Sequence, residues 1–342
     1  MTAAAAGAPS TGVLDTREAP WTFSAPWGAR GWVTDLDGPV HWIEFTGSGT
    51  NGSGTNGSGA HRDSAPPIVF VHGLGGSHLN WVTIGSALAA DRRAVALDLH
   101  GFGLTPGLRR NSTVTANAAL LDRFLREVVG VPAVLVGNSM GGLISILQSA
   151  RHPETVAGAV LLDPALPQLG QRPDPRVIGQ FLTYALPGAG ELFLRATNSR
   201  VPPALAVRQI LALCFADPSR ASDQLVEAMI QLTSQRRLLV GTEAPFLAAA
   251  RSTMRTVASP RRYQAIMNRI RVPVLLINGE QDRLVSITSA RAAAAANPHW
   301  QSQFLPGVGH TPQLEVPEVV IDAVRGWLAG HAELRTGRGA AS

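Results

Sequence analysis

The feature that most constrains the fold of this chain is a serine-containing turn between a strand-like run and a helix-like run. The turn, residues 137–141, reads Gly-Asn-Ser-Met-Gly and follows the apolar run Ala-Val-Leu-Val at 133–136, and the residues after it continue with helical spacing. A strand, a tight Gly-x-Ser-x-Gly turn and a helix form a nucleophile elbow. Gly137 and Gly141 allow the two backbones to pass closely, which exposes the Ser139 hydroxyl in front of the N–H groups of the helix.

Strand-like and helix-like segments alternate on both sides of this turn, which predicts a mainly parallel central sheet flanked by helices. Two early strands are expected within residues 31–46, around the Asp37-Gly38 turn. The other expected strands are residues 68–71, 93–99, 156–163, 272–277 and 301–304, and the expected helices are residues 79–90, 113–129, 286–296 and 317–328.

The alternation is interrupted by residues 164–269, which contain amphipathic segments and no clear strand. We interpret this block as a helical lid inserted into an α/β core, with a separate helical domain as the alternative. The expected organisation is an N-terminal extension (1–30), the first half of the core (31–163), the lid (164–269), the second half of the core (270–330) and a C-terminal tail (331–342).

Residues 47–59 form a tract in which Gly-Ser-Gly-Thr-Asn occurs twice and then begins again. Such a segment has too little apolar surface to order itself, so we expect a flexible loop.

Composition excludes several classes of function. The chain has no lysine, so all 29 basic residues are arginine; they are scattered along the sequence, and the net charge is only +5. A nucleic-acid-binding protein more often gathers its basic residues on one face. Cys214 is the only cysteine, which rules out an intrachain disulfide and gives no indication of a zinc site. There is no signal-peptide pattern and no apolar run of membrane-spanning length, so we expect a cytoplasmic protein without stable membrane insertion.

Ser139 needs a base to activate it and an acid to orient that base. His310 is the best candidate base among nine histidines, because it lies in a glycine-containing loop, residues 306–312, directly after the last expected strand. Asp282 is the best candidate acid, because it follows the strand at 272–277, and α/β proteins place functional groups at the carboxyl ends of strands.

Two other carboxylates compete for the role of Asp282. Asp163 also ends an expected strand and is the main rival, and Glu280 lies two positions before Asp282. Asp98 is better interpreted as a structural residue in the turn that follows its strand.

A glycine-rich turn, residues 71–76, follows the first parallel strand and supplies the remaining part of the site. We expect the backbone N–H groups of Leu74 and Met140 to form an oxyanion hole, and His72 to brace the turn. The turn lacks both the Lys-Ser/Thr ending and the GxGxxG spacing of phosphate-binding loops.

Five motifs together resemble the α/β-hydrolase superfamily over roughly residues 30 to 330. In chain order they are HGLGG (72–76), DLHGFG (98–103), GNSMGG (137–142), NGEQD (278–282) and GVGH (307–310). The resemblance implies the α/β-hydrolase fold, with Ser139 as nucleophile, His310 as base and Asp282 as acid, in the chain order typical of this superfamily. It also implies Leu74 and Met140 as oxyanion donors, and neither a metal nor an organic cofactor.

Within the superfamily, a lidded serine esterase or lipase fits best, acting on a small-molecule ester. The apolar residues of the lid favour lipophilic acyl esters, although core packing accounts for the same residues. The elbow also resembles that of hydrolases that cleave carbon–carbon bonds in ring-fission products, but those carry a Trp after the catalytic His, where this chain has Thr311.

Cofactor-free perhydrolases of the haloperoxidase type share the elbow but usually lack a long lid. Haloalkane dehalogenases and epoxide hydrolases resemble the lid and layout but use an Asp where Ser139 stands. A non-catalytic receptor or scaffold is the alternative from another class, and such proteins tend to lose a member of the triad. The oligomeric state is left open by the sequence.

Overall fold

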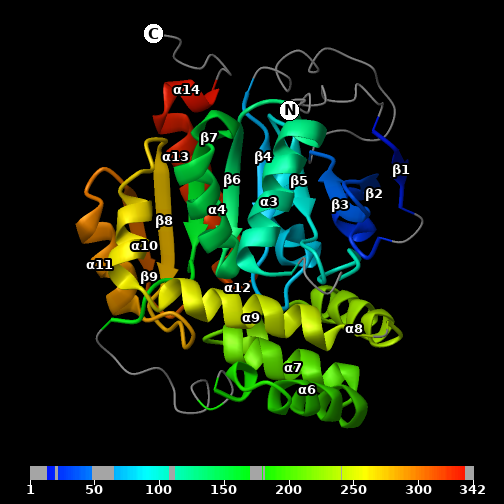
Figure 1. Cartoon of the computed structure of the whole chain (residues 1–342). Helices are drawn as coiled ribbons and strands as arrows, with labels where there is room; N and C mark the ends of the chain where they lie inside the picture. The colour runs from blue at the N-terminus through cyan, green and yellow to red at the C-terminus, as the bar shows by residue number, and fades with distance from the viewer. Residues whose placement is uncertain are drawn as a thin grey trace, which may run out of the picture.

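A nine-stranded sheet runs through the molecule and carries the strand before Ser139 near its centre (Figure 1). The computed structural model describes residues 14–19, 22–47, 65–107, 112–169, 179, 182–239 and 241–335. The strands are β1 (Thr16–Glu18), β2 (Ala29–Asp35), β3 (Pro39–Phe45), β4 (Ile68–Val71), β5 (Ala94–Leu97), β6 (Ala133–Asn138), β7 (Val156–Leu162), β8 (Val274–Gly279) and β9 (Gln301–Leu305).

The strand order is β1-β2-β3-β5-β4-β6-β7-β8-β9. The pairs from β1 to β5 are antiparallel, and the pairs from β5 to β9 are parallel. The sheet is therefore mainly parallel, and the predicted fold class is confirmed. β1 and the start of β2 lie within the segment expected to be an extension, so part of that segment belongs to the sheet.

From β5 to β8 both faces of the parallel part of the sheet are buried, which explains the continuous apolar runs in these strands, whereas the edge strand β9 is mostly exposed. In β4, Val69 and Val71 join one core cluster, while Ile68 and Phe70 join the other. Helices α3 (Val114–Phe124) and α4 (Met140–Arg151) contribute to the first cluster. Helices α2 (Val82–Leu88) and α13 (Pro317–Gly330) contribute to the second.

Two predicted helices are less regular than their sequence pattern indicates. The helix expected at 79–90 begins as a 3₁₀ turn (His78–Trp81) before α2, and the helix expected at 113–129 ends in a π-helical turn (Leu125–Val129) after α3. Apolar spacing does not distinguish these windings, because all of them can place the same side chains against the core. The remaining helices of the core are α11 (Ile287–Ala296), α12 (Pro312–Glu315) and α14 (Ala332–Arg335).

The described part of the segment between β7 and β8 contains helices joined by loops and no strand. Its long helices are α6 (Ala189–Arg200), α7 (Pro203–Cys214), α8 (Asp223–Arg237), α9 (Glu243–Val257) and α10 (Pro260–Met267). Helices α6 to α9 lie beyond the end of the sheet toward which β8 runs (Figure 1). Because β7 and β8 pair directly in the sheet, this segment is an insertion between neighbouring strands, and we call it the insertion.

Several sequence-based expectations fall on residues outside this description. These residues are most of the tract at 47–59, the first part of the extension, the end of the tail, and two apolar residues assigned to the lid, Ile178 and Phe181. In the part of the chain that is described, no helix is both long and apolar enough to cross a membrane.

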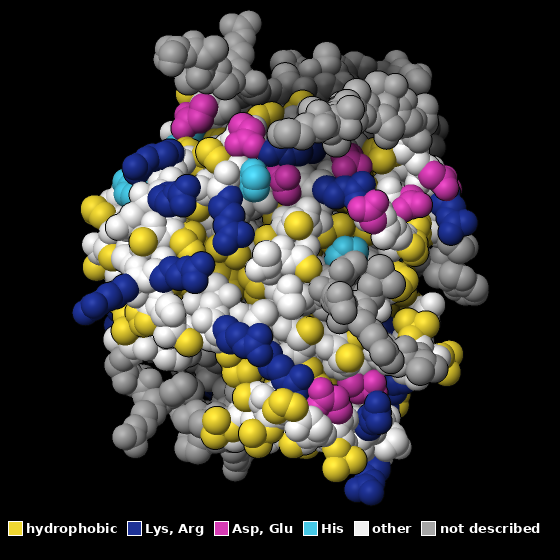
Figure 2. Space-filling view, in the orientation of Figure 1, with side chains coloured by type: hydrophobic (Ala, Val, Ile, Leu, Met, Phe, Trp, Pro, Cys, Tyr) yellow, Lys and Arg dark blue, Asp and Glu magenta, His cyan; other side chains and the backbone are white. Residues whose placement is uncertain are grey.

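Arginine side chains are spread over the face in Figure 2 among apolar and acidic side chains. Ion pairs also form between neighbouring helical turns. Arg126, in the π-helical turn after α3, lies 3.0 Å from Asp122 of α3 and also contacts Glu154.

Candidate active site

Ser139 lies between β6 and α4 in a backbone conformation that residues with side chains rarely adopt, with φ of 55° and ψ of −119°. Such conformations cost about 1–3 kcal/mol and concentrate at functional sites. A Cβ atom on Gly137 would lie 2.5 Å from the Gly141 carbonyl oxygen, and one on Gly141 would lie 1.9 Å from the Val71 carbonyl oxygen. Only glycine at these two positions allows β6, α4 and β4 to pack this closely, and the Ser139 side chain remains half-buried.

The glycine-rich turn after β4 lies against the elbow, since a Cβ on Gly73 would be 2.9 Å from the Ser139 Cβ. His72 holds this turn. Its Nδ1–H donates to the Gly73 carbonyl oxygen at 2.8 Å, and its Nε2 accepts the Leu99 N–H at 3.1 Å. Burial lowers the pKa of His72 to about 4, so the ring is neutral and provides the one donor and one acceptor that these contacts need.

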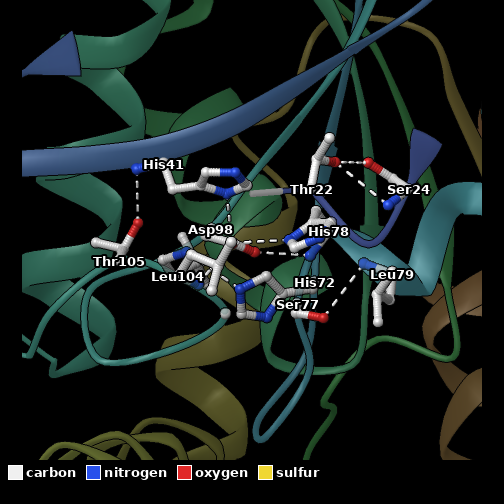
Figure 3. A network of polar contacts seen from close by, with 12 residues as sticks. Thr22, Ser24, His41, His72, Ser77, His78, Leu79, Asp98, Leu104 and Thr105 are labelled. Carbon is white, nitrogen blue, oxygen red and sulfur yellow. Dashed lines mark hydrogen bonds and ion pairs between the residues drawn. The ribbon is translucent and has the colours of Figure 1, made fainter. Parts of the chain in front are cut away.

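A buried network centred on Asp98 fixes the segments around this turn (Figure 3). One Asp98 oxygen accepts hydrogen bonds from Nδ1 of His41, Nδ1 of His78 and the Leu104 N–H, each at 2.8 Å. The other accepts the His78 N–H at 2.7 Å. Burial alone would raise the pKa of Asp98, but the two imidazoles outweigh it and hold this pKa well below its usual value. Asp98 is therefore a structural anchor, as the sequence indicated.

Leu74 lies in the glycine-rich turn, and Met140, directly after Ser139, is the first residue of α4. In the described part of the chain, neither backbone N–H group is paired with a backbone carbonyl. Both are thus available to an added acceptor, which is one condition that oxyanion donors must meet.

Asp282 and His310 are brought into direct contact. The loop after β8 places Asp282 so that one carboxylate oxygen accepts the N–H groups of Leu284 (2.7 Å) and Val285 (3.1 Å). The other oxygen lies 2.7 Å from His310 Nδ1. His310 is 4% exposed, and its own N–H donates to the Cys214 carbonyl oxygen at 2.6 Å. The backbone contacts of both residues fix the geometry of the imidazole–carboxylate pair.

The two rival carboxylates differ in position. Glu280 pairs with Arg291 at 2.7 Å and has no hydrogen bond to His310. Asp163 is fully buried and lies beside Asp282 and His310. Its carboxylate, the Asp282 carboxylate and the His310 ring each present an atom within 4.8 Å of the others.

Among the described residues, two groups of side chains have ligand types and spacing that could hold a metal ion. One is His41, His78 and Asp98, and the other is Asp163, Asp282 and His310. In both groups the histidine Nδ1 atoms lie 2.7–2.8 Å from a carboxylate oxygen. These are hydrogen-bond distances, and a protonated Nδ1 has no lone pair for a metal. The residues present therefore fit hydrogen-bonded networks better than metal centres.

Two residues that contribute to this site were not singled out from the sequence. The Asn138 side chain donates to the carbonyl oxygens of Leu162 and His310, both at 3.0 Å, and so connects the residue before Ser139 to the His310 loop. Glu315 is buried and accepts the Gly309 N–H at 2.8 Å. The only available signal for Asn138 was its position inside the elbow motif.

Glu315 also connects the His310 loop to the insertion. It accepts the N–H groups of Ala216 (3.1 Å) and Asp217 (2.9 Å), just after α7, and its carboxylate lies 3.0 Å from the Arg220 guanidinium. No sequence pattern links these positions, which lie about a hundred residues apart, so only the folded chain identifies the contact.

A separate groove of about 440 Å³ lies between α3 and α4 and is lined by residues that include Asp37, His100, Asp122, Arg123 and His152. None of Ser139, Asp282 and His310 lines it.

Comparison with known proteins gives a family context for this geometry. A sequence model described as "Alpha/beta hydrolase family" matches residues 68–323. The dihydrolipoyllysine-residue acetyltransferase component of the acetoin cleaving system from Pseudomonas putida is 27% identical over 322 residues, covering 90% of this chain and 75% of that protein. A probable esterase, PIR7A from Oryza sativa subsp. indica, is 38% identical over 112 residues, covering 32% of this chain and 43% of that protein.

Among solved structures, a putative lipase from Acinetobacter baumannii AYE superposes with a TM-score of 0.69. The alignment covers 95% of this chain and 98% of that chain at 20% sequence identity. At this identity the similarity concerns the fold alone.

Proposed function

The chain belongs to the alpha/beta hydrolase family, and from this premise we propose that it hydrolyses carboxylic esters through an acyl-enzyme on Ser139. The observation that carries the proposal has two parts. Ser139 is strained and half-buried at the elbow, where its neighbour Asn138 donates to the His310 carbonyl oxygen, and His310 Nδ1 lies 2.7 Å from Asp282. A probable esterase among the similar proteins supports the same reaction class.

In the proposed mechanism, Ser139 Oγ attacks the ester carbonyl while His310 Nε2 takes its proton. Asp282 keeps the proton of the neutral ring on Nδ1 and stabilises the charged ring that forms. The negative oxygen of the tetrahedral intermediate accepts the N–H groups of Leu74 and Met140. The intermediate collapses when His310 returns the proton to the leaving alcohol, and water then repeats the sequence to release the acid.

We further propose that the insertion acts as a lid and that the acyl group is lipophilic. Leu74 packs against an apolar cluster of Tyr184, Leu247 and Ala250 with Phe246, all from the insertion. The Phe246 ring would lie 3.4 Å from a Cβ on Gly75, so it covers the glycine-rich turn directly. An apolar cluster beside the oxyanion donors favours an apolar acyl chain over a charged one.

A fluorophosphonate probe tests the reaction class, because it labels a serine only when that serine is activated. We expect labelling of the wild type and none of Ser139→Ala. Wild-type protein that resists the probe would favour a receptor or scaffold. A panel of acyl esters assayed beside ring-fission dienoates then tests the substrate class, and faster turnover of the dienoates would favour carbon–carbon bond hydrolysis.

A further inference from the structure

Buried carboxylates in this molecule differ in the number of donors they receive. Asp98 accepts bonds from His41, from Leu104 and twice from His78. Glu315 accepts Gly309, Ala216, Asp217 and Arg220. An ionised carboxylate needs donors of this kind when it leaves water, so both groups are placed to carry a negative charge.

Asp163 lacks such donors although it is 0% exposed. It follows β7 with a φ of 42°, its N–H donates to the Ile277 carbonyl oxygen, and its Oδ1 accepts the Gly279 N–H at 2.9 Å. Its Oδ2 has no donor among the described residues. The side chain is therefore held in place by one hydrogen bond and leaves one buried oxygen unpaired.

Another carboxylate lies close to that of Asp163. Asp163 and Asp282 present oxygens within 4.8 Å of each other, and both can only accept hydrogen bonds when ionised. Two adjacent negative charges away from water repel strongly, and one proton shared between them removes the repulsion. Asp282 accepts Leu284, Val285 and His310, whereas Asp163 accepts Gly279 alone. The proton therefore belongs on Asp163.

We propose that Asp163 is protonated in the resting enzyme and donates a hydrogen bond from Oδ2 to the Asp282 carboxylate, which makes it a positioning residue for the candidate acid. The hydrogen bond satisfies the unpaired oxygen and gives the Asp282 carboxylate one more fixed contact. His310 then has one ionised partner, Asp282, and one neutral neighbour, Asp163.

The electrostatic surroundings agree with this assignment. Burial, and then the charge of Asp282, raise the pKa of Asp163 well above its usual value against the opposing Gly279 hydrogen bond. The charge of Glu315 also raises the pKa of Asp163. His310 also faces this pair, with an atom within 4.8 Å of both carboxylates. Cys214 lies close by as well, and burial raises its pKa to about 12, so that it stays a neutral thiol.

The proton can be detected without any enzymatic activity, through the pH dependence of unfolding. An Asp163 that is protonated when folded and ionised when unfolded makes folding take up a proton, so its stabilising effect is lost as pH rises. Above pH ~5, the unfolding constant of the wild type should increase relative to that of Asp163→Asn by up to ~tenfold per pH unit, until the native group ionises. Urea unfolding at pH 5, 6, 7 and 8 measures this ratio.

Asp322→Asn is the matched control, because Asp322 is an exposed carboxylate on α13. The ratio of the wild-type unfolding constant to that of Asp322→Asn should stay constant from pH 5 to 8. A constant or falling ratio for Asp163→Asn would mean that Asp163 is ionised in the folded protein and would overturn the proposal.

Kinetics test the positioning role, which rests on the proposed function through Asp282. Asp163→Ala removes the hydrogen bond and should lower kcat by up to about 100-fold, the cost of a misplaced catalytic group. Asp163→Asn keeps a donor toward Asp282 and an acceptor for Gly279, so it should recover most of that loss. If Asp163→Asn is as slow as Asp163→Ala, Asp163 acts as an ionised acid. If the wild type has no esterase activity, the unfolding experiment still decides the protonation of Asp163.

Discussion

At the scale of single residues, the contacts of Asp282 favour it over its rivals as the partner of His310. Its carboxylate meets the imidazole at 2.7 Å, whereas Glu280 pairs with Arg291 and Asp163 is bonded to the Gly279 backbone. Asp282→Asn should therefore lower kcat by about 10⁴-fold, as in a related triad, because the amide favours the wrong tautomer of His310. Steady-state rates on an ester that the wild type hydrolyses measure this. Retained activity in Asp282→Asn, together with a loss of this size in Asp163→Asn, would identify Asp163 as the acid.

His72 should make the protein sensitive to acid. Its pKa falls from 6.5 when unfolded to about 4 when folded, because burial disfavours the charged ring. The folded state therefore binds fewer protons, and the stability that neutral His72 provides is present above pH 6.5 and lost as pH falls toward 4. We expect His72→Gln to be less stable than the wild type at pH 7. Between pH 7 and 5, however, its free energy of unfolding should fall by about 2 kcal/mol less than that of the wild type. Urea midpoints at the two pH values measure the difference, and an equal acid loss in both proteins would contradict it.

At the scale of secondary-structure elements, two glycines in helices should respond to alanine in opposite ways. In α4, a Cβ on Gly141 would overlap the Val71 carbonyl oxygen at 1.9 Å, whereas in α13 a Cβ on Gly326 meets nothing within 4 Å. Gly326→Ala should stabilise the protein by about 0.5–1 kcal/mol through helix propensity. Gly141→Ala should destabilise it by several times that amount, as a backbone clash in a core does. Thermal unfolding compares the two, and a neutral Gly141→Ala would mean that α4 can move away from β4.

The sequence predicted those elements whose environment is uniform along the chain. β4 and β6 lie under helices on both faces, so their residues had to be apolar throughout, and their position was readable from 68–71 and 133–136. The 3₁₀ and π turns beside α2 and α3 were not readable, because they place the same side chains in the core as an α-helix does.

The candidate site was predictable where a residue lies at the end of a strand, as Asp282 and His310 do. It was not predictable where the contact depends on segments far apart in the chain. Glu315 reaches across to residues 216 and 217, and His41 and His78 meet on Asp98. Each of these contacts is set by how the finished elements pack, which local sequence does not encode.

At the scale of the whole molecule, a few arginines fasten the insertion to the core. Arg236 on α8 donates to the carbonyl oxygens of Gly101 and Gly103, both at 2.6 Å. In Arg236→Gln we expect a protease to cleave the insertion faster than in the wild type during limited proteolysis. The far-ultraviolet circular dichroism spectrum should stay nearly unchanged, because the helices themselves remain folded. Arg208→Gln on α7 is the control, since Arg208 is exposed and has no ion pair in the described part of the chain. Equal cleavage rates for the two variants would show that Arg236 does not hold the insertion in place.

The pairing of β7 with β8 also sets an order in time. A ribosome makes the Ser139 elbow well before it makes β8, and the two strands that form the second half of the site can join the sheet only after the whole insertion has been synthesised. During that interval the chain holds the proposed nucleophile with neither its proposed base nor its proposed acid. A nascent chain should therefore have no hydrolase activity, and that activity should appear only at the last stage of folding.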